Sequence, residues 1–207
     1  LAGTVSARGE DAIGAHFAGD ITGALEIQGD ISSSGYRYTT VPGDVSRLDA
    51  DDLLQGGSAV LIQGDVTDGI IFAVPPKDEN ANNADEDGDG IEDAKEGSAK
   101  IASYGAAPAV VIGAVGRDIA IGPVQSTAAK YGLQIDGTIL GSGLYTGVDG
   151  NGIDLGAPPA APGATQLPSE TVQEEAQKLL VSDIGRDGER ERGERGAANG
   201  SDYEGTA

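Results

Sequence analysis

An acidic segment in the middle of the chain has the residue types and spacing of a cation-binding loop. Within residues 85–96, side chains with oxygen atoms stand at loop positions 1, 3, 5, 9 and 12, and a glycine stands at position 6. A hard cation such as Ca²⁺ takes about six to eight oxygen ligands, and a sharp turn at the glycine lets the ligands of one short loop converge. The sequence therefore predicts a Ca²⁺ site with these ligands: Asp85, Asp87, Asp89, the backbone carbonyl of Ile91, Asp93 and Glu96.

The loop differs from a paired EF-hand. Its apolar residue, Ile91, stands at position 7 instead of 8, and no amphipathic helix precedes Asp85. The segment instead resembles the Asp-rich repeats of thrombospondin type 3 modules and of many bacterial surface proteins. Extracellular Ca²⁺ sites bind at about 0.1–1 mM, so the resemblance implies an ion that stiffens the segment. The alternative is a solvated acidic linker, because charge runs commonly stay in solvent.

Other candidate groups carry weaker signals. The Gly-rich run from Asp149 to Asp154 is too compressed for a full cation cage and is typical of a turn. The only histidine, His16, has no serine or acid in a recognisable relation to it, and no G-x-S-x-G motif is present. We therefore expect no catalytic residues, no organic cofactor and no enzyme, although Arg117 and Lys130 would be the candidate bases of a polysaccharide lyase.

Composition limits the partners. The 207 residues carry 13 Lys and Arg against 34 Asp and Glu, a net charge of −21, which repels nucleic acids and anionic membranes. The chain has no cysteine, which excludes disulfides and thiolate metal sites, and no methionine, which leads us to expect a processed product or a fragment. No apolar stretch reaches the roughly 18 residues of a membrane span, so we expect no insertion of this chain into a membrane.

The elements that must position the acidic loop are short strands. An apolar-x-Gly-x-apolar unit recurs at 17–21, 27–31, 62–66 and 135–139, with a looser copy at 111–115. Its alternation predicts half-buried strands, and its glycine shares the apolar parity, which indicates a bend or bulge. The outward positions are predicted for Glu26, Gln28, Asp30, Gln63, Asp65, Gln134 and Asp136.

Short strands of this kind bury their apolar faces only when copies stack. The repeated unit therefore predicts an all-β fold, a parallel β-solenoid (β-helix) with an acidic insertion at 75–100. Because period-two alternation suits both folds, an antiparallel β-sandwich is the alternative.

Residues 105–113 and 117–124, followed by 131–137 and 145–153, resemble the passenger region of alphaproteobacterial autotransporters. The resemblance covers roughly residues 10–156. It implies a right-handed β-helix that is exported across the outer membrane, with this chain as a passenger fragment.

The repeated pattern stops after Gly156. We expect a solenoid domain over 1–156, a Pro/Ala linker over 157–168, and a short C-terminal helix with a polar tail over 169–207. The helix would cap the open end of the solenoid or dock on a neighbouring chain.

These observations favour a secreted or cell-surface structural or adhesive protein that Ca²⁺ stabilises. Its expected partners are further copies, as a homo-oligomer or end to end, and a host or cell-surface ligand. The alternatives are a carbohydrate-active β-helix, either a lyase or a hydrolase, and an acid-rich envelope protein that requires salt.

Overall fold

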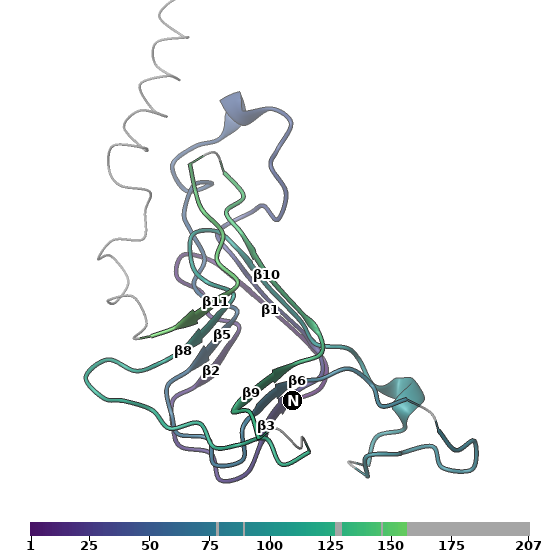
Figure 1. Ribbon diagram of the computed structural model, residues 1–207. Coiled ribbons are helices and arrows are strands. Elements are labelled where there is room, and N and C mark those ends of the chain that lie inside the picture. Colours follow the sequence, from purple (N-terminus) through teal and green to yellow (C-terminus); the bar gives the residue numbers. More distant parts are fainter. Residues whose placement is uncertain (78, 89, 127–129, 146, 157–207) are drawn as a thin grey trace, which may run out of the picture. The chain divides into compact units, whose positions relative to one another are not determined.

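Short parallel strands make up almost all the regular structure of the described residues (Figure 1). The computed structural model describes residues 1–77, 79–88, 90–126, 130–145 and 147–156. These residues contain the strands and two 3₁₀ helices that follow in chain order: β1 (Thr4–Arg8), β2 (Ala15–Phe17), β3 (Leu25–Ile27), β4 (Asp30–Ser34), η1 (Val45–Arg47), β5 (Val60–Ile62), β6 (Ile70–Phe72), η2 (Asp93–Lys95), β7 (Lys100–Tyr104), β8 (Val110–Ile112), β9 (Leu133–Ile135), β10 (Thr138–Ser142) and β11 (Ile153–Leu155). For the described residues, the prediction of an all-β fold with parallel strands is confirmed.

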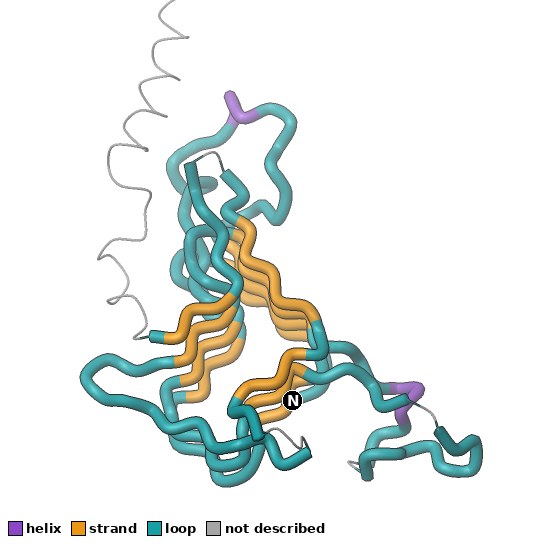
Figure 2. The backbone as a smooth tube through the Cα atoms, viewed as in Figure 1, coloured by secondary structure: helices purple, strands orange, loops and turns teal. Residues whose placement is uncertain are grey.

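Strands β1 to β8 each pair in parallel with the strand three places later in the chain. This rule builds three sheets, ordered β1-β4-β7-β10, β2-β5-β8-β11 and β3-β6-β9. Figure 2 shows the three stacks of strands. We call each passage through the sheets a circuit: β1–β3 form circuit 1, β4–β6 circuit 2, β7–β9 circuit 3, and β10 and β11 circuit 4. This pairing excludes the antiparallel sandwich.

The apolar residues of successive circuits stack in register. One such ladder consists of Val5, Ile31, Ile101 and Ile139. A second contains Ile27, Phe72 and Ile135, and a third contains Phe17, Ile62, Ile112 and Leu155. Ile62 and Phe72 are fully buried, because circuits 1 and 3 cover circuit 2 on both sides. The core therefore lies in the middle of the stack, where burial of apolar area stabilises the fold most.

The repeated units lie at corners, and their interpretation as continuous strands is wrong. Phe17, Ile27, Ile62 and Ile135 each end a strand, and the following glycine lies outside it. The glycines at 29, 64 and 137 have a packing reason: a Cβ there would overlap a backbone carbonyl of the preceding circuit, that of Gly3, Gly19 or Ala99 respectively. The corners of adjacent circuits therefore approach more closely than any side chain permits. Gln28, predicted to point outward, is 4% exposed because it lies in such a corner.

Two buried serines also belong to the interior. Ser33 and Ser103 are opposite each other in the ladder of β4 and β7. Ser33 Oγ donates to the carbonyl of Gly57 at 2.6 Å, and Ser103 Oγ donates to that of Ala107 at 2.8 Å. Each hydroxyl thus satisfies a corner carbonyl, which offsets the cost of burying both groups.

Long excursions leave the circuits at three different corners. They comprise residues 35–59 between β4 and β5, 73–99 between β6 and β7, and 113–132 between β8 and β9. The second is the predicted acidic insertion, slightly shifted from 75–100 because Lys100 already belongs to β7. The expected linker and C-terminal helix lie outside the described residues.

Candidate metal centre

The acidic loop is held in shape by its own carboxylates. Both oxygens of Asp85 accept backbone amides, from Gly88 at 2.8 Å and from Gly90 at 3.1 Å. Both glycines have positive φ angles, +76° and +91°, which side chains other than glycine rarely adopt. The two amides point inward because of these turns, and they fix the first predicted ligand.

The other end of the loop closes on its beginning. Asp93 Oδ1 accepts the amide of Glu86 at 3.1 Å, and the amide of Asp93 donates to the carbonyl of Ala84 at 2.8 Å. Asp93 also begins the 3₁₀ helix η2, so its position depends on that turn. These bonds bring Asp93, at loop position 9, next to Glu86, at loop position 2.

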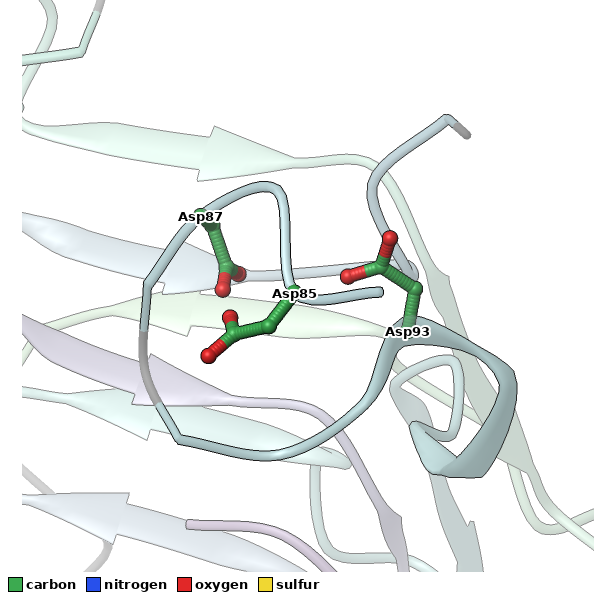
Figure 3. A group of neighbouring side chains, drawn as sticks. All are labelled: Asp85, Asp87 and Asp93. Carbon is green, nitrogen blue, oxygen red and sulfur yellow. The ribbon is translucent and has the colours of Figure 1, made fainter. Parts of the chain in front are cut away.

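Three of the predicted ligands come together as a result. One carboxylate oxygen from each of Asp85, Asp87 and Asp93 lies within 4.8 Å of the others (Figure 3). Opposite ligands in a Ca²⁺ sphere are about 4.6–5.2 Å apart, twice the usual Ca–O distance, so the group fits within such a sphere. The spacing alone does not distinguish Ca²⁺ from other hard cations. Three carboxylates give half of the six oxygens that a minimal Ca²⁺ cage requires.

The remaining predicted ligands are Asp89, Ile91 and Glu96. Asp89 lies outside the described residues. Ile91 is half-buried in the same loop. Glu96 Oε2 accepts a hydrogen bond from Gln28 Nε2 at 3.2 Å. Glu96 is therefore bonded to the corner between β3 and β4, and the loop is connected at its base to circuits 1 and 2.

A second charged cluster, which the sequence analysis did not single out, lies at another corner. Asp20 and Asp65 occupy equivalent positions in circuits 1 and 2, next to the paired residues Ile21 and Val66. Asp20 Oδ1 accepts the amide of Asp65 at 2.9 Å, and Asp65 Oδ1 accepts the amide of Ala120 in circuit 3, also at 2.9 Å. Each carboxylate therefore bridges its circuit to the next.

Arg117 compensates the two negative charges of this cluster. Its guanidinium is 2.9 Å from Asp20 Oδ1 and 3.5 Å from Asp65 Oδ1. The bond from the amide of Asp65, reinforced by Arg117, lowers the pKa of Asp20 below its ordinary 3.8. The sequence signal for this cluster was the repeated Gly-Asp pair at 19–20 and 64–65. Arg117, which the sequence analysis named as a candidate lyase base, pairs with both aspartates of this cluster.

A third acidic group stabilises the excursion 35–59. The Asp51 carboxyl hydrogen-bonds to that of Asp49, which raises the pKa of Asp51 and lowers that of Asp49. The buried Asp52 pairs with Arg37 at 3.4 Å, and its carbonyl accepts the Tyr145 hydroxyl at 2.9 Å. These contacts attach the excursion to circuit 4.

The weaker candidates lie at the surface. His16 is exposed, and its Nε2 lies 2.6 Å from Gln63 Oε1 in the next circuit. Asp149 and Asp154 are exposed as well, and neither belongs to the acidic group described above. Among the described residues, no helix has the length and apolar character needed to cross a membrane.

The stack of parallel circuits and the acidic loop were also compared with known proteins. The chain matched no protein-family model, no curated protein and no solved structure.

Proposed function

We propose that the chain is a secreted or cell-surface β-solenoid with a structural or adhesive role, stabilised by Ca²⁺. The observation that supports this most is the regular pairing of β1 to β8, each with the third strand after it, through four successive circuits. A right-handed winding follows from a general rule, since about 98% of crossovers between parallel strands of one sheet have that hand. The resemblance to autotransporter passengers agrees with this proposal.

A structural role suits the way this fold is stabilised. Each circuit contacts only its neighbours, so stability grows by adding circuits, and the outward faces repeat along the stack. The strongly acidic surface favours solubility and opposes unspecific association. The excursions leave the circuits at separate corners. They can therefore contact a host or cell-surface ligand, or further copies of the chain, without changing the stacked apolar residues of the sheets.

Calcium would act on the acidic excursion. Residues 75–100 contain nine acids and three lysines, a local net charge of −6. An ion held by Asp85, Asp87 and Asp93 would reduce their mutual repulsion, and the bond between Glu96 and Gln28 would connect the ordered loop to the stack. At 10 mM Ca²⁺ and a Kd near 0.5 mM, mass action would add about 1.8 kcal/mol to the free energy of unfolding.

Calorimetry and thermal melting test the site. We expect about 0.1–1 mM Ca²⁺ affinity, and a Tm that rises by about 4–7 °C in 10 mM Ca²⁺. Asp87→Asn should weaken binding at least tenfold, about 1.4 kcal/mol, because it removes a charged ligand. Glu79→Gln is the matched control, since it removes one negative charge from the same excursion outside the three-aspartate group. Equal affinity of both variants, or no binding by the native chain, would refute the site.

Electron microscopy of the purified chain, with and without chelator, tests the architecture and the role. Rods or filaments that shorten or soften without Ca²⁺ would support the structural proposal. Isotropic particles in both conditions would contradict it. Cleavage of an anionic or neutral polysaccharide by the same preparation would favour the carbohydrate-active alternative.

A further inference from the structure

Within the described residues, the stack of circuits has two edges. β1 and β2 pair on one side only, and so do β10 and β11 at the opposite end. Core-facing apolar residues are less covered there than in the middle of the stack: Phe17 is half-buried and Leu155 is 72% exposed, whereas Ile62 of the same ladder is fully buried. Unpaired strand edges with uncovered apolar side chains favour pairing with a further strand.

The two edges match each other in length and in register. β10 and β1 have five residues each, and β11 and β2 have three each. If the register between circuits were continued into a second copy, Ile139 would face Val5 of that copy, and Leu155 would face its Phe17. Both contacts would extend apolar ladders that already run through the core.

The charged residues of the edges distinguish one orientation from another. Asp154 is exposed in the middle of β11, and His16 is exposed in the middle of β2. Parallel pairing of β11 with β2 of a second copy sets an acid opposite a base, which is a favourable cross-strand pair. Antiparallel pairing of two β11 strands about their centres would set Asp154 opposite Asp154, and like charges directly opposite each other destabilise a sheet.

We propose that β10 and β11 of one copy pair in parallel with β1 and β2 of a second copy, with Asp154 opposite His16 of that copy. The proposal rests on the structural role proposed above and names the partner as the same chain, in one register. The described part of circuit 4 has no strand in the third sheet, so the junction consists of two sheets. Because the two surfaces differ, the contact repeats from copy to copy and builds open filaments.

Disulfide crosslinking between full chains tests the register. The protein has no native cysteine, so Leu140→Cys in β10 and Ser6→Cys in β1 each introduce a single exposed thiol. The junction sets these positions on neighbouring strands, which lie about 4.8 Å apart, within the Cα separation of about 4.4–6.8 Å that a disulfide requires. Lys100→Cys is the matched control for Ser6→Cys, because position 100 is exposed on the same sheet but belongs to β7, which pairs on both sides.

The two chains are mixed at about 0.15 M salt, which screens the net charge of −21 on each copy. We expect disulfides between positions 140 and 6 to form at least about tenfold faster than those between 140 and 100. Equal rates would overturn the proposal, and a predominance of disulfides between two cysteines at 140 would overturn it in favour of tail-to-tail pairing. Absence of the expected disulfide with an intact β spectrum in circular dichroism would refute the junction alone, whereas absence of the β spectrum from the native chain would refute the solenoid itself.

An exchange of charges tests the pairing of Asp154 with His16. In sedimentation velocity, His16→Asp should weaken association about two- to fivefold, because it sets two acids opposite each other. Adding Asp154→His should restore association, because the acid and the base have then changed places. Asp149→His, at another exposed aspartate, is the matched control and should not restore it. Restoration by both second substitutions, or by neither, would contradict the proposed register.

Discussion

The corner glycines allow a sharp test of the stacking, because two copies of one motif differ in their surroundings. A Cβ on Gly64 would overlap the carbonyl oxygen of Gly19 and lie 2.8 Å from the amide nitrogen of Asp20, where ordinary contact begins at 3.4 Å. A Cβ on Gly19 would meet nothing within 4 Å, because circuit 1 has no described circuit before it. Neither glycine has a positive φ. Gly64→Ala therefore tests packing alone, and Gly19→Ala is its control.

The cost of Gly64→Ala follows from the displacement it requires. Relieving the contact with Asp20 moves the two corners apart by at least 3.4 − 2.8 = 0.6 Å. The hydrogen bond from Ile21 to the Asp65 carbonyl would lengthen from 2.7 Å to 3.3 Å, and that from Gln63 to the Phe17 carbonyl from 2.8 Å to 3.4 Å. Both exceed the usual limit of about 3.2 Å. Two weakened bonds at about 1 kcal/mol each, together with about 1–3 kcal/mol for overpacking, give about 3–5 kcal/mol.

Urea denaturation followed by circular dichroism measures this difference. With an m value of about 2 kcal/mol/M, the midpoint of Gly64→Ala should fall by about 1.5–2.5 M. Gly19→Ala should lie within about 1 kcal/mol of the native chain, on the stabilising side, because alanine reduces the entropy of the unfolded state. If the two variants unfold at the same urea concentration, the close approach of corners does not hold and the explanation of the motif is wrong.

Two further predictions concern the core and the charged corner. Phe72→Ala should lower the free energy of unfolding by about 3–5 kcal/mol, because Phe72 is fully buried in circuit 2. Phe17→Ala should lower it clearly less, because Phe17 is half-buried in circuit 1, at the end of the stack. Urea titration of both variants measures the difference. Because the pKa of Asp20 is lowered, its contribution to stability is complete above 3.8 and is lost as pH falls through the lower folded-state value. Asp20→Asn should therefore flatten the decline of Tm below pH 4, and a decline parallel to that of the native chain would contradict the role of Asp20.

The repeated unit made the class of fold predictable from the sequence. The ligand spacing of residues 85–96 made part of the candidate metal site predictable. Alternation of apolar residues and the recurrent glycine indicated stacked short strands, because both follow from local rules of strand geometry. The ligand spacing of the acidic segment identified Asp85, Asp87 and Asp93, which the loop does bring together. Their convergence depends on turns at Gly88 and Gly90, which the sequence displays directly.

The remaining features depend on contacts between circuits, which one sequence does not display. The repeated unit shows the same alternation whether it continues a strand or turns a corner. Its glycine therefore predicted a bend or bulge, and the bends are present, but it did not predict the contact of Gly64 with Gly19 in the preceding circuit. The burial of Gln28 and its bond to Glu96 join residues 68 positions apart. The pairing of Arg117 with Asp20 spans 97 positions. No periodicity within either segment indicates these partners.

The buried serines of the first sheet bear on how the chain finds a single alignment. A slip of β7 by two residues along β4 would keep every apolar side chain facing inward, so hydrophobic alternation does not oppose it. Such a slip would set Ile101 beside Ser33 and leave Ser103 beyond the end of β4. The aliphatic ladder of Val5, Ile31, Ile101 and Ile139 would then be interrupted by a hydroxyl. Two small polar residues thereby discriminate among alignments that would otherwise be close in energy during assembly of the sheet.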